Sequence, residues 1–335
     1  MGHAICAMRP YTQGRLLFGK KEIFMPAILS HCLMAKEVYE QISGKEGLPI
    51  LDKRAFYWGA QGGDVFFFHR VLPWQRGKSL RKYGSLLHKQ EVDSVFEAMR
   101  EYVVYKSHRK ALALSYVCGY FCHYALDRAA HPYVYAAIQI LKENEKLTQD
   151  ILVHFRIESA LDVYLLKEKT GKHSNEIKLY ELLSGDSVVG DEIASLLAYV
   201  FKKVFGMPDQ KERMRRALLD MRLCYRFIND NHYIKRNAIR FFELLFGPKH
   251  ALSDLMLGKE PDTRFDYTNR ERAVWQSPFR PYVNRYESFD DLYAQAVREG
   301  KSMILAFRRS FHTMSSMFDI TGNRSFDTGE CINNG

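Results

Sequence analysis

Apolar residues recur at three- and four-residue spacing along most of the chain, which is the period of an amphipathic helix. The pattern opens at Met25 and Pro26, where Ile28 and Cys32 fall on one face. Further helices are predicted over residues 92–106, 107–140, 148–169, 190–205, 210–228, 232–246 and 288–318. Residues 247–285 carry Pro, Asn, Asp and Trp without a period and predict an extended loop. Because strand patterns are too few for a sheet, we expect an all-α fold, a multi-helix bundle.

The two ends of the chain lack this periodicity. Residues 1–24 mix Gly, Pro, Arg and Lys, and we expect them to form a loose extension, with the native chain starting at Met25. Residues 321–335 contain few apolar positions and predict a loose C-terminal tail. We expect residues 25–320 to form a single helical domain.

The composition is that of a protein with a folded core. Of the 335 residues, 47% are apolar and 13% aromatic, which excludes the disordered class. Lys and Arg number 49 against 39 acidic residues, so the formal charge is +10. This surplus favours anionic partners such as phospholipid headgroups, nucleic acid or phosphoesters, although it is equally typical of an ordinary basic surface.

No targeting or membrane segment is visible in the sequence. The longest apolar stretch, residues 111–122, is shorter than the roughly 20 residues that a membrane-spanning helix needs. The start of the chain has no apolar core that ends in a cleavage site, and the six cysteines are too scattered for a disulfide scaffold. We therefore expect a cytoplasmic protein, with peripheral contact to the inner membrane surface as a further expectation.

The strongest chemical signal lies at His123, Asp127 and His131, which are spaced by four residues. Each step of four turns a side chain by only about 40° around a helix axis, so all three project from one face. The preceding segment is apolar, so this face is expected to point into the bundle. Two imidazoles and a carboxylate are costly to bury unless something compensates them, and a divalent cation does so.

A second set with the same spacing is formed by His154, Glu158 and Asp162, in a helix with an apolar face. Facing ladders of this kind build multi-metal sites in helical bundles, and imidazole with carboxylate suits zinc. The alternative is an exposed face on which the acidic residues pair with Arg156 and Lys167.

Three more candidates lie upstream. Asp64 follows a glycine pair in aromatic surroundings, His88 follows Gly84, and His31 lies on the first predicted helix. A lone histidine is usually a surface residue or a satisfied core residue, so each of these depends on the others. We expect a structural role for His69, which follows three phenylalanines.

In this order the residues resemble the zinc-dependent phospholipase C family, which shares its fold with single-strand-specific zinc nucleases. The likeness covers residues 25–165, the expected metal core, and is weaker at residues 275–278 and 325–329, which are similar to bacterial members. The resemblance implies three ligand sets: Asp64, His88, His123 and Asp127 for one zinc; His131, His154 and Glu158 for a second; and His31 with the bridging Asp127 for a third. In the family an N-terminal Trp completes the third site. Because this sequence has no such Trp, we expect two or three zinc ions.

The activity that the resemblance implies is hydrolysis of a phospholipid or related phosphodiester by a metal-activated water. We expect Asp64 to orient that water and to act as general base. Phe56, Tyr57, Phe66 and Phe67 either face the apolar part of a substrate or pack in the core. Two alternatives stay open: a nuclease of the same fold, ranked lower because no base-stacking platform is visible, and a non-catalytic protein that metal merely stabilises.

Overall fold

The computed structural model describes residues 27–72, 74–145, 150–230, 232–246, 253, 256–263 and 265–332. Over these ranges the chain is helical, and its only strand-like pairings are two isolated bridges. The all-α prediction is therefore confirmed. No helix within these ranges combines the length and the apolar character needed to cross a membrane.

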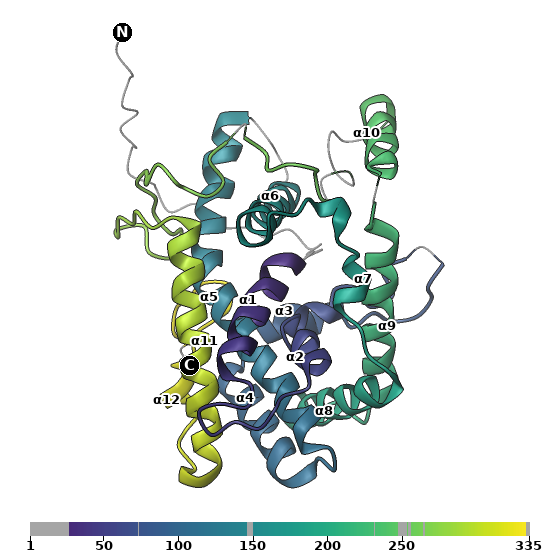
Figure 1. The fold of residues 1–335 in the computed structure, drawn as a ribbon, viewed down its shortest axis with the longest axis vertical. Helices are drawn as coiled ribbons and strands as arrows, with labels where there is room; N and C mark the ends of the chain where they lie inside the picture. Colours follow the sequence, from purple (N-terminus) through teal and green to yellow (C-terminus); the bar gives the residue numbers. More distant parts are fainter. Residues whose placement is uncertain are drawn as a thin grey trace.

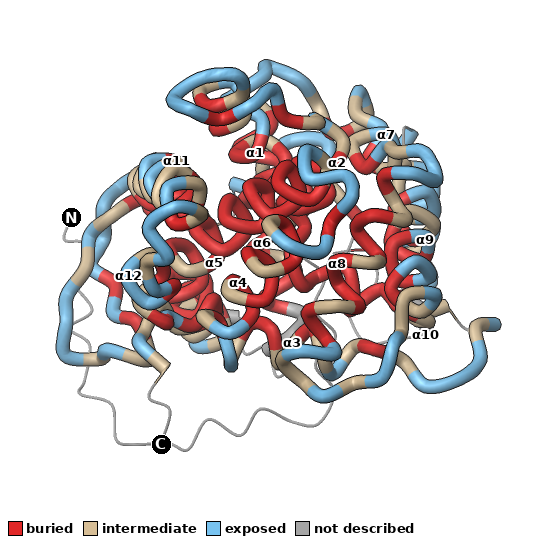
Figure 2. Tube along the Cα trace, turned by 90° about the horizontal axis from the view of Figure 1, so that it is seen from below, coloured by how far each residue is buried: buried red, intermediate tan, exposed pale blue. Residues whose placement is uncertain are grey.

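One long helix, α5 (Lys110–Glu145), runs through the middle of the molecule (Figure 1). Five other helices pack around it: α1 (Ile28–Ile42), α2 (Lys53–Gly59), α6 (Asp150–Thr170), α8 (Ser187–Phe205) and α11 (Phe289–Thr313). Buried residues concentrate along these central helices, while the connecting loops are exposed (Figure 2). The core thus forms around α5.

The remaining helices are short or peripheral: η1 (Gly62–Phe66), α3 (Arg81–Lys89), α4 (Val92–Glu101), η2 (Tyr102–Lys106), η3 (Ser174–Glu176), α7 (Leu179–Leu182), α9 (Lys211–Ile228), α10 (Ile234–Phe246) and α12 (Phe318–Thr321). The long predicted helices agree with the structure to within a few residues. The segment predicted as one helix over residues 92–106 divides into α4 and a π-helical turn, η2.

Two glycines allow α2 and α5 to touch backbone to backbone. A Cβ on Gly59 would lie 1.9 Å from the carbonyl oxygen of Tyr116, and one on Gly119 would lie 1.9 Å from that of Phe56. No larger residue fits at either position without moving a helix. The crossing fixes the end of α2 on α5, and η1, which begins at Gly62, follows directly.

The first turn of α1 takes its acceptor from α6. The N-cap residue Ala27 has no side-chain oxygen, and the two carboxylate oxygens of Asp162 accept hydrogen bonds from the amides of Leu29 (3.0 Å) and Ser30 (2.7 Å). Burial raises the pKa of Asp162 to about 6, although the bonds from Ser30 and Leu29 act to lower it. This contact sets the position of His31, the next residue on α1.

The expectation of a loose tail over residues 321–335 differs from the structure. The residues 323–332, called here the C-terminal loop, fold back on themselves, with Ser325 donating to the carbonyl of Glu330 (2.9 Å) and Ile332 to that of Asn323 (2.8 Å). Phe326 and its neighbour Asp327 are buried. Few apolar residues are needed here, because one aromatic ring and several turn hydrogen bonds hold the loop. The extension expected over residues 1–24 lies outside the described residues.

Candidate metal centre

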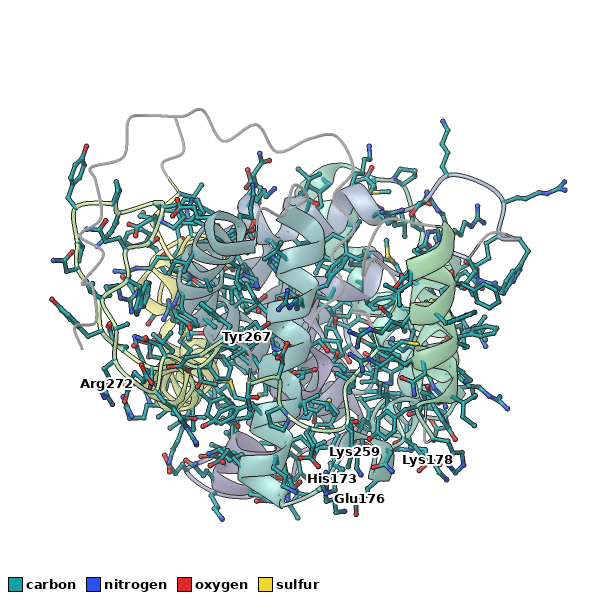
Figure 3. All side chains as sticks on the ribbon, turned by 90° about the horizontal axis from the view of Figure 1, so that it is seen from above. His173, Glu176, Lys178, Lys259, Tyr267 and Arg272 are labelled. Atoms are coloured by element: carbon teal, nitrogen blue, oxygen red, sulfur yellow. The ribbon has the colours of Figure 1, made fainter. Side chains whose placement is uncertain are left out.

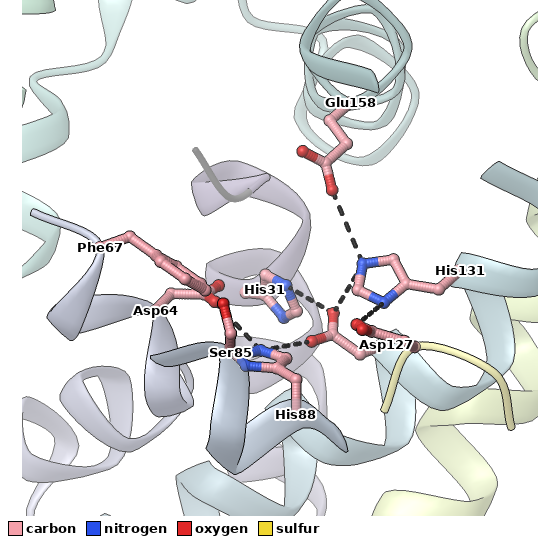
Figure 4. A pocket seen from close by; sticks show the side chains of 9 residues that line it. His31, Asp64, Phe67, Ser85, His88, Asp127, His131 and Glu158 are labelled. Atoms are coloured by element: carbon pink, nitrogen blue, oxygen red, sulfur yellow. Dashed lines mark ion pairs between the residues drawn. The ribbon is translucent and has the colours of Figure 1, made fainter. Parts of the chain in front are cut away.

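The side chains that the sequence suggests as metal ligands meet in one buried place, and Figure 4 shows those that line its pocket. Each of them is at most 7% exposed: His31, Asp64, His88, His123, Asp127, His131, His154 and Glu158. They come from α1, η1, α3, α5 and α6. Residues far apart in the sequence therefore converge, as is expected if the two sets of side chains spaced by four residues share one site.

Asp127 of α5 lies at the centre of the cluster. Its Oδ2 atom is 3.1 Å from Nε2 of His123 and 3.4 Å from Nε2 of His88, and its Oδ1 atom is 3.2 Å from Nε2 of His31. Three imidazoles from three helices thus direct the same ring nitrogen at one carboxylate. This is the position expected of a bridging ligand.

Asp64 closes the cluster on the side of η1. Its Oδ1 atom is 3.1 Å from Nε2 of His88, and its Oδ2 atom is 3.9 Å from Nε2 of His123. Gly62 makes room for this arrangement, because a Cβ there would lie only 1.9 Å from the ring of His123 and the φ angle is +51°. The glycine pair before Asp64 therefore has a steric function as well as a conformational one.

A second group lies between α5 and α6. Nε2 of His154 is 2.8 Å from Oε1 of Glu158, and Nε2 of His131 is 3.7 Å from the same oxygen. His131 is also 3.8 Å from Oδ1 of Asp127 through Nε2, so it connects the two groups. In Figure 4 its ring lies between Glu158 and Asp127.

The hydrogen bonds of two histidines indicate which ring nitrogen holds a lone pair. Nδ1 of His88 lies 2.8 Å from the carbonyl of Gly84, and Nδ1 of His131 lies 3.2 Å from that of Phe326. A carbonyl can only accept, so Nδ1 carries the hydrogen, and in a neutral ring Nε2 presents its lone pair to the carboxylates. Lone pairs that face anions repel one another unless a cation lies between them.

Buried oxygens without a hydrogen-bond donor point the same way. Among the described residues, Oδ2 of Asp127 and Oε2 of Glu158 have no such donor. A buried carboxylate oxygen left in this condition is costly, whereas a divalent cation would compensate it. The donor set of imidazole nitrogens and carboxylate oxygens is the one that zinc prefers.

The candidate ligands form three groups, and within each group the ligand atoms all lie within 4.8 Å of one another. The groups are His31, His123 and Asp127; Asp64, His88 and His123; and His131, His154 and Glu158. The group of His131, His154 and Glu158 is one of the sets that the resemblance implies. The group of Asp64, His88 and His123 lacks Asp127 of its implied set, and the group of His31 and Asp127 gains His123, whose ring centroid lies 4.4 Å from that of His31. The geometry therefore suits two or three cations that share ligands.

Burial and mutual contact shift the pKa values of the cluster in opposite directions. Burial lowers the pKa of His123 well below its usual value, and the neighbouring histidines lower it further. For His88 burial also acts to lower the pKa, but contact with Asp127 and Asp64 raises it well above normal. Burial raises the pKa of Asp64 despite the contact with His88. Protons and cations thus compete for the same nitrogen atoms.

A narrow pocket opens onto the cluster. Besides six of the candidate ligands, its walls include Phe67, Ser85 and Asp327. Phe67 is thus the one of the four named aromatic residues that lines the pocket. Ser85 and Asp327 were not identified as candidates from the sequence, because neither belongs to a histidine–carboxylate ladder.

The other three aromatics lie elsewhere. Phe56 and Phe66 are fully buried, and their rings pack against Tyr39 and Phe201 respectively, which is the core alternative. Tyr57 is half-buried and does not line the pocket.

Two described histidines that the sequence analysis left out of the site, His69 and His173, also lie outside the cluster. Nδ1 of His69 accepts a hydrogen bond from the amide of Leu80 (3.0 Å), which fits the structural role expected for it. His173 lies at the periphery of the molecule (Figure 3), where its Nδ1 is 3.0 Å from a carboxylate oxygen of Glu260. Neither belongs to a group of ligand type in the described part of the chain.

Comparison with known proteins yields one match. Residues 30–205, which span α1 to α8 and more than half of the chain, match the model of a family described as zinc dependent phospholipase C. No curated protein and no solved structure matches the chain. Every candidate ligand lies inside the matched range.

Proposed function

Because the chain belongs to the zinc-dependent phospholipase C family, we propose that its buried cluster binds two or three zinc ions and hydrolyses a phosphodiester bond, with a phospholipid as the first candidate substrate. The observation that carries the proposal is the convergence of imidazole Nε2 atoms on buried carboxylates, together with two carboxylate oxygens, Oδ2 of Asp127 and Oε2 of Glu158, that lack a hydrogen-bond donor among the described residues. This arrangement is stable when a cation occupies the space between them.

We assign the ligands as the family resemblance implies. One zinc would be held by Asp64, His88, His123 and Asp127, a second by His131, His154 and Glu158, and a third by His31 and Asp127, and the groups of ligand atoms support this assignment in most of their members. The distances around Asp127 support its role as the bridge, since imidazoles of three helices face its two oxygens. His123 is close enough to the third group to contribute there as well.

Asp64 is the residue we propose as general base. When bound, zinc supplies Lewis acidity, which polarises a phosphoryl oxygen and lowers the pKa of water. Asp64 lines the pocket, so its carboxylate is placed to accept a hydrogen bond from a water that enters there. It takes one proton from the attacking water. A new oxygen–phosphorus bond forms and the bond from phosphorus to the leaving oxygen breaks. The leaving oxygen takes the proton back from Asp64, so the alcohol departs neutral and the carboxylate is restored, while the second proton of the water stays on the phosphate product.

The rest of the pocket suits a small anionic group. Phe67 covers one side of the pocket and limits access of bulk water to the cluster, and Ser85 offers a hydroxyl. The formal charge of +10 favours approach of an anionic substrate or of an anionic lipid surface. Contact with the membrane surface is therefore part of the proposal.

The test combines metal analysis with assays on defined substrates. Mass spectrometry of the purified protein should find two or three zinc ions per chain, and phospholipid vesicles should be hydrolysed. Asp64→Asn should abolish turnover and keep most of the metal, because a neutral amide can still contribute an oxygen ligand but cannot accept the proton. The matched control is Asp319→Asn, at an exposed position on α12 away from the pocket.

Three outcomes would separate the alternatives. Full activity of Asp64→Asn would remove Asp64 from the base role. Hydrolysis of single-stranded nucleic acid but not of phospholipid would establish a nuclease. Bound zinc that raises the melting temperature without hydrolysis of any diester would leave a structural metal cluster and overturn the catalytic proposal.

A further inference from the structure

The C-terminal loop reaches the metal centre from outside the range that matches the family model. The matched range ends at residue 205, whereas Phe326 and Asp327 lie against the cluster. We propose that this loop is a working part of the centre, in which Asp327 is a positioning residue that, with the carbonyl of Phe326, holds His131 for zinc. The inference rests on the proposed zinc site, but its test does not depend on hydrolysis.

The loop makes direct contact with two candidate ligands. Nδ1 of His131 donates to the carbonyl of Phe326 (3.2 Å) and is 3.7 Å from Oδ1 of Asp327. On the other side, the amide of Phe326 and the hydroxyl of Ser325 each donate to the backbone carbonyl of His88 (3.1 Å). The loop thus joins α3, which carries His88, to α5, which carries His131.

The ring of Phe326 fills the space beneath the cluster. Its centroid is 5.0 Å from the ring of His88 and 5.7 Å from that of His123, and it packs at 4.6 Å on Tyr124. Phe326 is 2% exposed. An apolar ring in this position excludes water from the rear of the cluster and limits rotation of two imidazoles.

The loop is seated firmly enough to position a ligand. The hydroxyl of Tyr124 donates to the carbonyls of Thr321 (3.0 Å) and Arg324 (2.9 Å). Gly329 lies so close to α5 that a Cβ would be 3.0 Å from the carbonyl of Arg128. That carbonyl belongs to the turn interrupted by Pro132, which has no amide hydrogen to give it.

The chemistry of Asp327 follows from this seat. Its carboxylate is 4% exposed, lines the pocket and lies on the Nδ1 side of His131, opposite to the Nε2 atom that faces Glu158 and Asp127. A carboxylate near Nδ1 favours the tautomer with hydrogen on that atom, makes Nε2 a stronger ligand and fixes the plane of the ring. The carbonyl of Phe326 fixes the direction of the Nδ1–H bond of His131, and the carboxylate of Asp327 adds negative charge beside it.

The experiment measures metal binding rather than turnover. Competition with a chromogenic chelator should show that Asp327→Ala weakens zinc binding about 10- to 100-fold for one ion, the usual effect of removing an outer partner of a histidine ligand. Asp327→Asn, which keeps the shape and an acceptor oxygen, should fall between Asp327→Ala and the wild type. Asp319→Asn, in the same part of the chain, should bind zinc like the wild type.

A second readout separates positioning from general loss of stability. The cobalt-substituted protein should show a changed visible absorption spectrum in Asp327→Ala, because the field around the ion that His131 binds is altered. Circular dichroism must show a native fold in both variants. Zinc affinity within twofold of the wild type in Asp327→Ala, or weaker binding with an unchanged cobalt spectrum, would overturn the proposal. Either result stands whether or not the wild type hydrolyses a phosphodiester.

Discussion

Two buried carboxylate clusters in this molecule are satisfied in different ways. On α9, Asp220 is 1% exposed, and it accepts hydrogen bonds from the amide of Arg70 (2.9 Å), the side-chain amide of Gln75 (2.6 Å) and the guanidinium of Arg216 (2.8 Å). Protein donors account for both of its oxygens. In the metal centre, Oδ2 of Asp127 is equally enclosed but has no hydrogen-bond donor among the described residues.

The difference in hydrogen-bond donors distinguishes a structural carboxylate, Asp220, from a candidate metal ligand, Asp127. The Asp220 cluster is complete as protein alone, and it ties the segment after η1 to α9. The metal centre instead brings Nε2 of His88 and Nε2 of His123 to the same oxygen of Asp127, at 3.4 Å and 3.1 Å, and to within 3.3 Å of each other. We therefore expect metal to bind and stabilise the metal centre and to leave the Asp220 cluster unchanged. Four experiments test this contrast.

The largest effect is expected from His123→Ala. This imidazole belongs to two of the three ligand groups, so its loss should remove at least one zinc. Zinc contributes several kcal/mol to such reactions, so phosphodiesterase activity should fall at least ~10³-fold. Asp220→Asn should keep zinc and activity. Equal losses in the two variants, measured by turnover and metal content, would abolish the distinction.

The next largest effect is expected at Asp162, a carboxylate close to the metal centre whose oxygens accept hydrogen bonds from protein groups. Asp162 lies one turn from Glu158 but accepts from α1 amides. Asp162→Ala leaves two buried N–H groups without an acceptor, and should lower the free energy of unfolding by about 3 kcal/mol. Asp162→Asn should cost less. Urea unfolding should show these losses in the zinc-free protein as well as in the loaded one.

Removal of zinc should lower the free energy of unfolding by a smaller amount, and only through the metal centre. Zinc at one hundred times its dissociation constant stabilises a protein by ~2.7 kcal/mol per independent site. Chelation should therefore lower the unfolding midpoint of the wild type. The same decrement should be found in Asp220→Asn, since that cluster does not use zinc. Identical unfolding curves with and without chelator would contradict the proposed site.

The last effect concerns a histidine that needs no metal, and it is the smallest when it is measured over a single pH unit. Burial lowers the pKa of His69 to about 4, although Asp220 nearby acts to raise it. The unfolded chain, with a histidine pKa near 6.5, binds the proton more readily, so stability is complete above about pH 6.5 and falls as the pH drops toward about 4. The slope is at most ~1.4 kcal/mol per pH unit.

His69→Asn, which keeps an acceptor for Leu80, should flatten this dependence. The measurement is the free energy of unfolding of both proteins at several pH values between 4 and 7. Parallel curves would show that His69 does not titrate as its surroundings imply.

Sequence reasoning found the ladder of α5 because spacing and burial agree there. Steps of four place His123, Asp127 and His131 on one face, and the apolar residues before them require that face to point inward. The same logic is incomplete for α6. Asp162 continues the spacing of His154 and Glu158, yet it faces the amides of α1. Periodicity fixes the face of a helix, but the neighbouring element decides what a side chain on it contacts.

Other parts of the site could not be predicted, because their sequences carry too weak a periodic pattern. The helices η1 and α3 are too short for a period to stand out, although both place residues at the site. Asp327 lies in a loop, where no spacing rule applies. Its position depends on contacts of the loop with Tyr124 and His88, which are distant in the sequence.

The place of the C-terminal loop in the chain has a consequence for biosynthesis. Helices near the N-terminus can fold while the ribosome is still adding residues. His131 and His88, however, gain their contacts with Ser325 and Phe326 only after the C-terminal loop has been made. A translation product that stops short of these residues would hold every candidate ligand from His31 to Glu158 and still lack the contacts that orient two of them. The tightest metal binding is therefore expected only after the ribosome has added the loop.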